Sequence, residues 1–135
     1  MPSVCGIGKK LLTLQIHIIM NNIRNTIIDA IQDKKGRDIC TINLSSILSA
    51  PAFDFVICQG KTPTQNSAIA DNIIDMVREK CHRKPLRIDG MRNGQWIIVD
   101  FGDTMVHVFT PEYREFYNLE DLWIDGIKEE IPNLD

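Results

Sequence analysis

The sequence GQWIIVDFGDTMVHVF, residues 94–109, predicts a β-hairpin more clearly than any other part of the chain. Two strand-like runs, Gln95–Phe101 and Thr104–Phe109, flank the dipeptide Gly102-Asp103. Glycine at the first turn position fits a two-residue turn of type II′, whose twist matches that of the flanking strands. We therefore expect two adjacent antiparallel strands here.

The register of this hairpin divides its side chains between two faces, because successive residues of a strand point to opposite sides. One face carries three facing pairs: Trp96 with Phe109, Ile98 with His107, and Asp100 with Met105. The other face carries five apolar side chains: Ile97, Val99, Phe101, Val106 and Val108. Both faces are largely apolar, so we expect other elements to cover both.

Upstream of the hairpin, Phe53–Gln59 is apolar almost throughout, which is typical of a central strand covered on both faces. A helix is predicted from Thr62 to about Cys81. Thr62 can cap it, Pro63 suits its first turn, and Gln65 can reach back as in a capping box. A strand followed by a helix and another strand implies a crossover with a parallel strand pair.

The remaining elements follow from apolar spacing and from Gly and Pro breaks. They are a helix from Asn21 to Gly36, strands at Asp38–Leu44 and Lys84–Ile88, and a short helical turn at Thr110–Tyr117. A last helix follows: Asn118 caps it, its apolar stripe extends to Ile127, and Pro132 ends it. The fold class is α/β, a single domain with a mixed sheet of about five strands flanked by helices. We place the domain at residues 20–130, with an N-terminal extension at 1–19, of the kind that can be disordered, and a tail at 131–135.

Length and composition fit one ordinary domain. The 135 residues are 44% hydrophobic and 24% charged, and no apolar run reaches the roughly 20 residues of a membrane span. The four cysteines form no CxxC pair and fit neither a disulfide framework nor a zinc site. We expect a cytoplasmic protein in a reducing environment, with no membrane partner.

Charge is unevenly distributed along the chain. The net charge is −3, which argues against broad binding to nucleic-acid phosphates. Residues 112–135 hold eight acidic and two basic side chains, so this end is strongly acidic. Taken alone, that pattern is more often a solvated helix face, but it also suits a basic protein partner.

Catalysis has one candidate pair, Asp100 and His107, which share a hairpin face. A carboxylate can orient an imidazole for proton transfer, but no nucleophile accompanies the pair in the sequence, and a histidine on an apolar strand is more often a core residue. Asp100 and Asp103 could hold magnesium, although Asp103 is explained more simply as a turn residue. The scattered histidines form no metal motif. We predict no catalytic residue, no metal and no cofactor.

Two surfaces remain as binding candidates. The basic cluster runs from Arg78 to Arg87 and could contact RNA phosphate, but cations at the end of a helix also complement its dipole, and we favour that interpretation. The last 40 positions include the aromatic residues Trp96, Phe101, Tyr113, Phe116, Tyr117 and Trp123. Core packing explains most aromatic residues, but Trp and Tyr beside an acidic segment also indicate a protein-binding surface.

Four segments resemble the ribosomal silencing factor, or Iojap-like, family. They are FDFVICQG at Phe53–Gly60, SAIADNI at Ser67–Ile73, WIIVDFGDTMVHVF at Trp96–Phe109 and REFYNLEDLW at Arg114–Trp123. The resemblance covers residues 20–123 in order. The hairpin together with the YxLExLW pattern is specific. The chain differs at Lys61–Thr64, where many relatives have Ser and Arg, and at Phe101, where an aliphatic residue is common.

This resemblance implies a reduced nucleotidyltransferase-type fold without catalytic function. It implies a non-enzymatic factor that binds the large ribosomal subunit through a ribosomal protein at the intersubunit face, the fourteenth of that subunit's series. The bound factor would exclude the small subunit and repress translation. The implied contacts are Trp96, Phe101 and Tyr117, and the free protein is expected to be a homodimer. A residual enzyme using Asp100 and His107, or an RNA-binding module using the basic cluster, are the alternatives.

Overall fold

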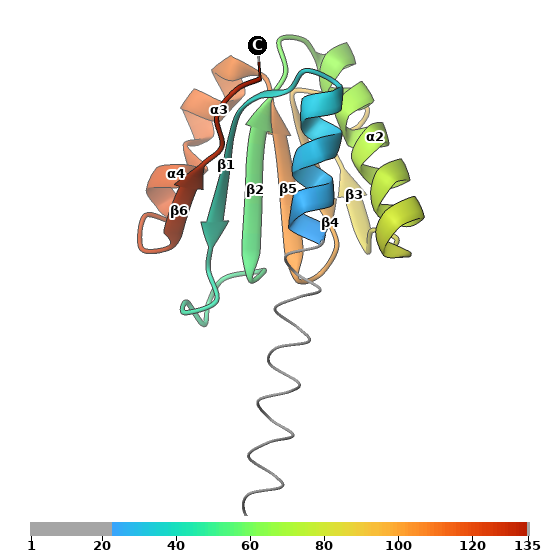
Figure 1. Ribbon diagram of the computed structural model, residues 1–135. Helices are drawn as coiled ribbons and strands as arrows, with labels where there is room; N and C mark the ends of the chain where they lie inside the picture. The colour runs from blue at the N-terminus through green and yellow to red at the C-terminus, as the bar shows by residue number, and fades with distance from the viewer. Residues whose placement is uncertain (1–22, 135) are drawn as a thin grey trace, which may run out of the picture.

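The computed structural model describes residues 23–134, which form a six-stranded mixed sheet with helices on both faces (Figure 1). The predicted extension at 1–19 and the predicted helix start at Asn21 lie outside the described residues. A helix over residues 23–33 comes first. The other elements are β1 (Arg37–Asn43), β2 (Asp54–Gln59), α2 (Pro63–Cys81), β3 (Arg87–Asp89), β4 (Trp96–Asp100), β5 (Thr104–Phe109), α3 (Pro111–Tyr117), α4 (Leu119–Leu122) and β6 (Ile127–Glu130). Their order across the sheet is β3-β4-β5-β2-β1-β6.

The hairpin β4–β5 has the predicted register. Trp96 pairs with Phe109, Ile98 with His107, and Asp100 with Met105. Gly102 has a φ of 95°, a conformation that a residue with a Cβ rarely adopts, so glycine is needed at this turn. The local turn chemistry therefore determines the pairing of these two strands.

Strand β2 is central, as its apolar sequence predicted, with β5 on one side and β1 on the other. The parallel pair is β2 and β5, whereas β3, the strand that follows α2, lies at the edge beside β4. Helix α2 begins as expected: Thr62 Oγ1 accepts a hydrogen bond from the Gln65 N–H at 3.1 Å. The Gln65 side chain reaches back one residue further than in a capping box, to the Lys61 N–H at 2.8 Å.

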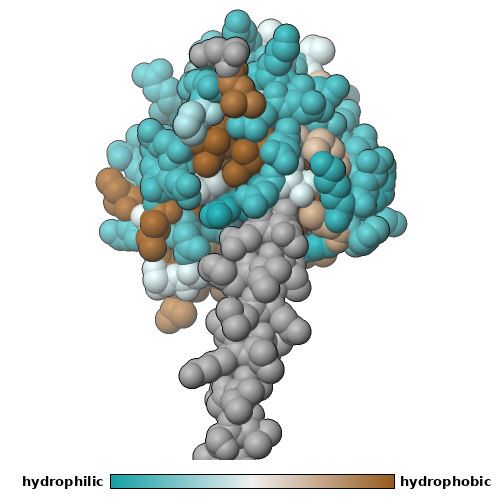
Figure 2. All heavy atoms as spheres, viewed as in Figure 1, coloured by the Kyte–Doolittle hydropathy of each residue, from teal (hydrophilic) through white to brown (hydrophobic). Residues whose placement is uncertain are grey.

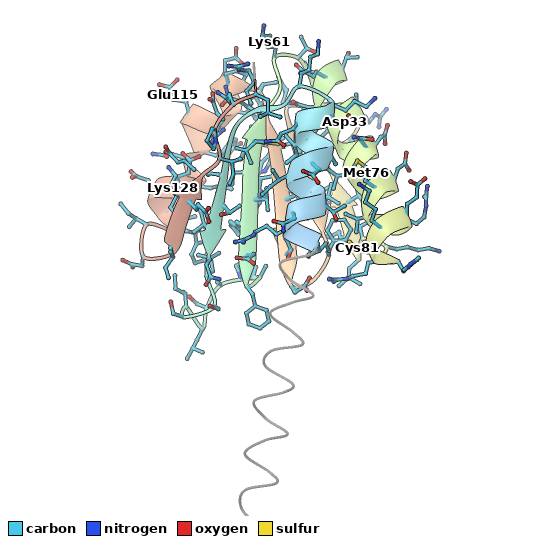
Figure 3. The ribbon with its side chains drawn as sticks, in the orientation of Figure 1. Asp33, Lys61, Met76, Cys81, Glu115 and Lys128 are labelled. Atoms are coloured by element: carbon cyan, nitrogen blue, oxygen red, sulfur yellow. The ribbon has the colours of Figure 1, made fainter. Side chains whose placement is uncertain are left out.

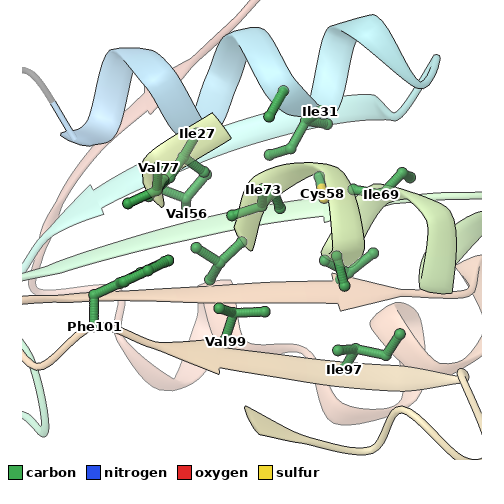
Figure 4. Close-up of a cluster of buried hydrophobic side chains, with 14 of the residues drawn as sticks. Ile27, Ile31, Val56, Cys58, Ile69, Ile73, Val77, Ile97, Val99 and Phe101 are labelled. Atoms are coloured by element: carbon green, nitrogen blue, oxygen red, sulfur yellow. The ribbon is translucent and has the colours of Figure 1, made fainter. Parts of the chain in front are cut away.

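Two cores lie on the two faces of the sheet. The helix over residues 23–33 and α2 cover one face, and Figure 4 shows their side chains, such as Ile27 and Ile73, meeting Val56 and Val99 of the strands. The other face packs Phe55, Phe109 and their neighbours against α3 and α4. The expectation that both faces of the hairpin are covered is confirmed.

The predicted last helix is wrong beyond Leu122. Helix α4 has only four residues, and the chain then forms β6, which pairs antiparallel with the edge of β1. At Gly126 an added Cβ would lie only 2.5 Å from Ile42 and 2.8 Å from Leu44, so glycine permits a close approach to β1. Pairing with β6 satisfies the N–H and C=O groups along the outer edge of β1, which would stay unpaired if the chain continued as a helix. It also adds a sixth strand to the five expected.

The predicted tail also contacts the sheet within the described residues. The Ile131 N–H donates to the Ile39 carbonyl at 2.9 Å, and Asn133 exchanges two hydrogen bonds with Asp38. The chain is therefore fastened to β1 as far as Asn133.

Candidate partner-binding site

An aromatic surface lies where β4 begins and α3 ends. We define it by Trp96, Tyr113, Phe116 and Tyr117. The ring centroids of Trp96 and Tyr117 are 4.7 Å apart, and those of Phe116 and Tyr117 are 5.1 Å apart. Phe116 is 80% exposed and Tyr117 is 45% exposed, which is unusual for rings of this size.

Strand β5 and α3 bring this surface together. Thr110 directly follows β5, and its N–H donates to the Gln95 carbonyl at 2.9 Å, which holds the start of α3 beside the start of β4. Phe109 lies under the site, fully buried, with its ring stacked on Trp96 at 5.1 Å. The side chains of α3 border a surface hollow of about 310 Å³, lined by Glu112, Tyr113, Phe116 and Tyr117. The rings are thus set on a rigid base and present an open apolar face.

Phe101 does not belong to this surface. Its side chain is 2% exposed and packs in the core beneath the helices, next to Val99 (Figure 4). The expected contact of Phe101 with a partner is therefore corrected, because a covered ring has no face to offer. The alternation of the hairpin put Phe101 on the face opposite to that of Trp96, but only the fold shows that the helix over residues 23–33 and α2 cover that face.

Asp100 and His107, the candidate catalytic pair, each make a structural hydrogen bond. Asp100 Oδ1 accepts the Gly102 N–H at 2.8 Å and so supports the hairpin turn. His107 is 3% exposed, and its Nδ1 accepts the Trp96 indole N–H at 3.1 Å. Its Nε2 is buried without a hydrogen-bond partner among residues 23–134, a state that costs about 1–3 kcal/mol. Each of the two therefore has a structural partner of its own among residues 23–134.

Burial lowers the pKa of His107 from its ordinary value of 6.5 to about 3. Between these two pH values the unfolded chain binds a proton that the folded chain does not, so stability falls as the pH drops below about 6.5. One proton changes the free energy by about 1.4 kcal/mol per pH unit, so we expect a loss of about 2 kcal/mol from this residue at pH 5. Urea unfolding of the wild type and His107→Phe at pH 7 and pH 5 measures it.

Comparing the loss of stability in the wild type with that in His107→Phe separates the contribution of His107 from that of the other titrating groups. The wild type should lose about 2 kcal/mol more than His107→Phe between the two pH values. Equal losses in the wild type and His107→Phe would show that the buried imidazole protonates as readily as a free one.

Part of the acidic end lies beside the aromatic surface, since Glu112 lines the same hollow as Tyr113, Phe116 and Tyr117. Its Arg114 is used internally: Nε and Nη2 donate to Glu120 Oε1 at 2.9 and 2.6 Å, and Nη1 donates to the Asp38 carbonyl. Glu112 and Glu115 of α3 remain exposed, as does Asp121 of α4. Figure 3 shows Glu115 on α3 and Lys128 on β6 at the same side of the molecule. Glu112 and Glu115, which are exposed next to the rings along α3, form an acidic rim, and this rim suits a basic partner.

The basic cluster is largely neutralised within the fold. Arg78 pairs with Asp75, and Arg87 pairs with Asp89, each at 3.0 Å. Arg83 makes a bidentate pair with Asp103 at 2.9 and 3.0 Å and also donates to the Phe101 carbonyl at 2.7 Å. Arg83 therefore ties the segment after α2 to the hairpin turn, and the turn residue Asp103 has a partner that local spacing did not indicate.

Replacing Arg83 with methionine should destabilise the chain by about 1–3 kcal/mol, because a part-buried carboxylate and a turn carbonyl lose their donor. Arg87→Met is the matched control: its ion pair is more than half exposed and should contribute less than about 1 kcal/mol. Urea denaturation of both variants checks this. Equal losses would mean that the bidentate geometry adds nothing.

Residues 23–134 include no cluster of three or more His, Cys, Asp or Glu side chains that could hold a metal ion. Burial raises the pKa of the Cys40 thiol to about 11 and that of Cys58 to about 12, so neither is a ready nucleophile at neutral pH. No helix among the described residues is long and apolar enough to span a membrane.

The fold and site together define a small α/β protein with an aromatic surface beside acidic side chains. The chain belongs to the family of ribosomal silencing factors. The family model described as "Ribosomal silencing factor during starvation" matches residues 19–135. The predicted family and the α/β fold class are thereby confirmed.

Named relatives support the same family. The chain is 38% identical over 97 residues to ribosomal silencing factor RsfS of Bacillus subtilis, covering 72% of this chain and 80% of the relative. It is 34% identical over 107 residues to the protein of that name from Halalkalibacterium halodurans, covering 79% and 90%. The mouse protein "Mitochondrial assembly of ribosomal large subunit protein 1" is 31% identical over 99 residues, 72% of this chain and 43% of that protein.

Solved structures are similar as well. A crystal structure of a protein from Chromobacterium violaceum has a TM-score of 0.72 at 30% identity and covers 76% of this chain and 84% of that one. A second, from Bacillus halodurans, has a TM-score of 0.71 at 30% identity and covers 82% and 99%. These structures share the fold over most of their length.

Proposed function

We propose that this chain silences ribosomes by binding the large subunit and blocking its joining to the small one. The binding site is the aromatic surface, with Trp96 and Tyr117 at its centre and the acidic residues at its rim. The partner is a basic ribosomal protein at the intersubunit face, the fourteenth of the large-subunit series. The observation that carries this is a cluster of contacting rings, of which Phe116 and Tyr117 are exposed and Trp96 is half-buried, in a member of the ribosomal silencing factor family.

The proposed mechanism requires binding alone and no catalysed reaction. A factor that binds the free subunit and is excluded from the joined pair opposes joining by RT ln(1 + [L]/Kd), about 2.7 kcal/mol at a hundredfold excess over Kd. Trp and Tyr rings that become buried against the partner supply affinity, and the acidic rim attracts a basic surface during encounter. We accordingly propose a cytoplasmic, non-enzymatic regulator of translation.

Sedimentation of ribosomal subunits in sucrose gradients, under joining conditions, tests the proposal. With the chain in excess, we expect the chain to travel with the large subunit and the joined-ribosome peak to fall. If the chain stays at the top of the gradient and joining is unchanged, the proposal is wrong for this protein. If it binds naked RNA with steep salt dependence, the basic cluster would be the site instead.

We further propose that the free chain is a homodimer. Apolar side chains are exposed beside the open edge of β6, namely Leu122, Ile124 and Ile127. Figure 2 shows brown, apolar atoms at the left edge of the visible face, where Figure 1 places α4 and β6. Exposed apolar residues next to the open side of an edge strand favour association. Light scattering of the free protein would give twice the mass of one chain, and a monomeric mass would refute the dimer.

A further inference from the structure

We propose that His107 is a positioning residue for the binding surface, holding the Trp96 indole in the orientation that the partner recognises. This inference rests on the proposed function and assigns His107 a role within that same site.

Geometry is the first argument. His107 faces Ile98 across the hairpin, and Trp96 lies two residues before Ile98, so the two rings are diagonal neighbours on one sheet face. The indole N–H donates to His107 Nδ1 at 3.1 Å. Phe109 and Tyr117 contact the indole only through their rings. Stacking allows a ring to slide or turn, whereas a hydrogen bond from a single N–H sets the direction in which the indole points.

The state of the imidazole is the second argument. An Nδ1 that accepts a hydrogen bond carries no proton, so the neutral ring holds its proton on Nε2. Nε2 is buried without a partner among residues 23–134. A phenyl ring in this place would bury no unsatisfied donor, so stability alone does not account for a histidine. What the imidazole offers and a phenyl ring does not is the acceptor for Trp96.

The support behind His107 is the third argument. Phe55 lies against the imidazole at 4.6 Å, and Trp123 meets Phe55 edge-on at 6.0 Å. These rings come from β2 and from the segment after α4, so the acceptor is held by elements outside the hairpin. The burial that keeps the pKa of His107 low also keeps its Nδ1 free to accept throughout the neutral range.

Nuclear magnetic resonance tests the hydrogen bond directly. In the ¹⁵N-labelled full chain, we expect scalar coupling between Trp96 Nε1 and His107 Nδ1 across the bond, and a protonated Nε2. Trp96→Phe assigns the indole signal, since the chain has only two tryptophans. Absence of coupling, or a proton on Nδ1, would overturn the inference without reference to ribosomes.

Binding to purified large subunits tests the consequence. His107→Phe keeps a ring but removes the acceptor, and it should bind about tenfold more weakly, as expected for one lost orienting hydrogen bond. His107→Asn places an oxygen near the position of Nδ1 and should recover part of that loss. Met105→Leu, on the same strand and face, is the matched control and should bind like the wild type.

The outcomes separate the two proposals. If the wild type binds and His107→Phe binds equally well, His107 does not position the site and the proposed function stands. If His107→Phe and His107→Asn lose binding equally although urea unfolding shows both to be folded, the acceptor is not what matters and the inference fails. If the wild type itself does not bind the subunit, the proposed function fails. The role of His107 in positioning a binding surface then fails as well, even if scalar coupling between Trp96 Nε1 and His107 Nδ1 is observed.

Discussion

Trp96→Ala should weaken binding to the large ribosomal subunit by about 30-fold or more, which corresponds to the loss of about 2 kcal/mol or more at a tryptophan hot spot. Trp96 is the ring at which Phe109, His107 and Tyr117 meet. Its removal takes away both the contact area and the neighbour that supports Tyr117. Affinity measured against immobilised large subunits gives the effect directly.

A fold control is needed because Trp96 is also half-buried. Urea unfolding should show that Trp96→Ala remains folded at the concentration used for binding. Leu48→Ala is the matched control: Leu48 is fully exposed in the loop between β1 and β2 and should bind like the wild type. A folded Trp96→Ala variant that binds with wild-type affinity would remove Trp96 from the site.

Phe109→Ala should destabilise the chain by about 3–5 kcal/mol, the usual cost of deleting a buried phenyl ring. Phe109 is fully buried and stacks on Trp96 from below. A small domain has only about 5–15 kcal/mol of stability, so the variant should unfold at much lower urea concentration. The midpoint of unfolding, followed by circular dichroism, measures the loss.

Phe109→Leu distinguishes the effect of side-chain volume on stability from the effect of the flat ring on binding. It keeps most of the apolar volume and should cost less than about 1.5 kcal/mol, but it removes the flat ring on which the indole stacks. We therefore expect Phe109→Leu to affect binding more than stability. If Phe109→Ala costs less than about 1 kcal/mol, the ring is not part of a close-packed core.

Local patterns in the sequence predicted much of this fold. The alternation around Gly102-Asp103 determined the hairpin register, because a two-residue turn allows one pairing and strand side chains alternate with a period of two. Thr62-Pro63 located the start of α2, since a cap acts on N–H groups within three residues. Phe53–Gln59, which is apolar almost throughout, predicted a central strand in the same way.

The aromatic residues illustrate what local pattern leaves open. Phe101 and Tyr117 were both expected at the partner surface, yet Phe101 is 2% exposed and Tyr117 is 45% exposed. The helices that cover Phe101 begin far from it in the chain, and only their packing removes it from solvent. The Trp96–His107 hydrogen bond is an intermediate case: the register makes the two residues neighbours, but the side-chain orientation depends on Phe55 and Phe109.

The sequence by itself determined the hairpin and the main helix, because each depends on residues close together in the chain, and it indicated the family through four motifs that can each be read from the sequence. Only the tertiary structure decided that residues 127–130 form an edge strand, that Arg83 holds the turn at Asp103, and that the exposed rings gather around Trp96. These features arise from contacts between distant segments, and their free energy comes from backbone groups and surfaces that meet only when the sheet is assembled.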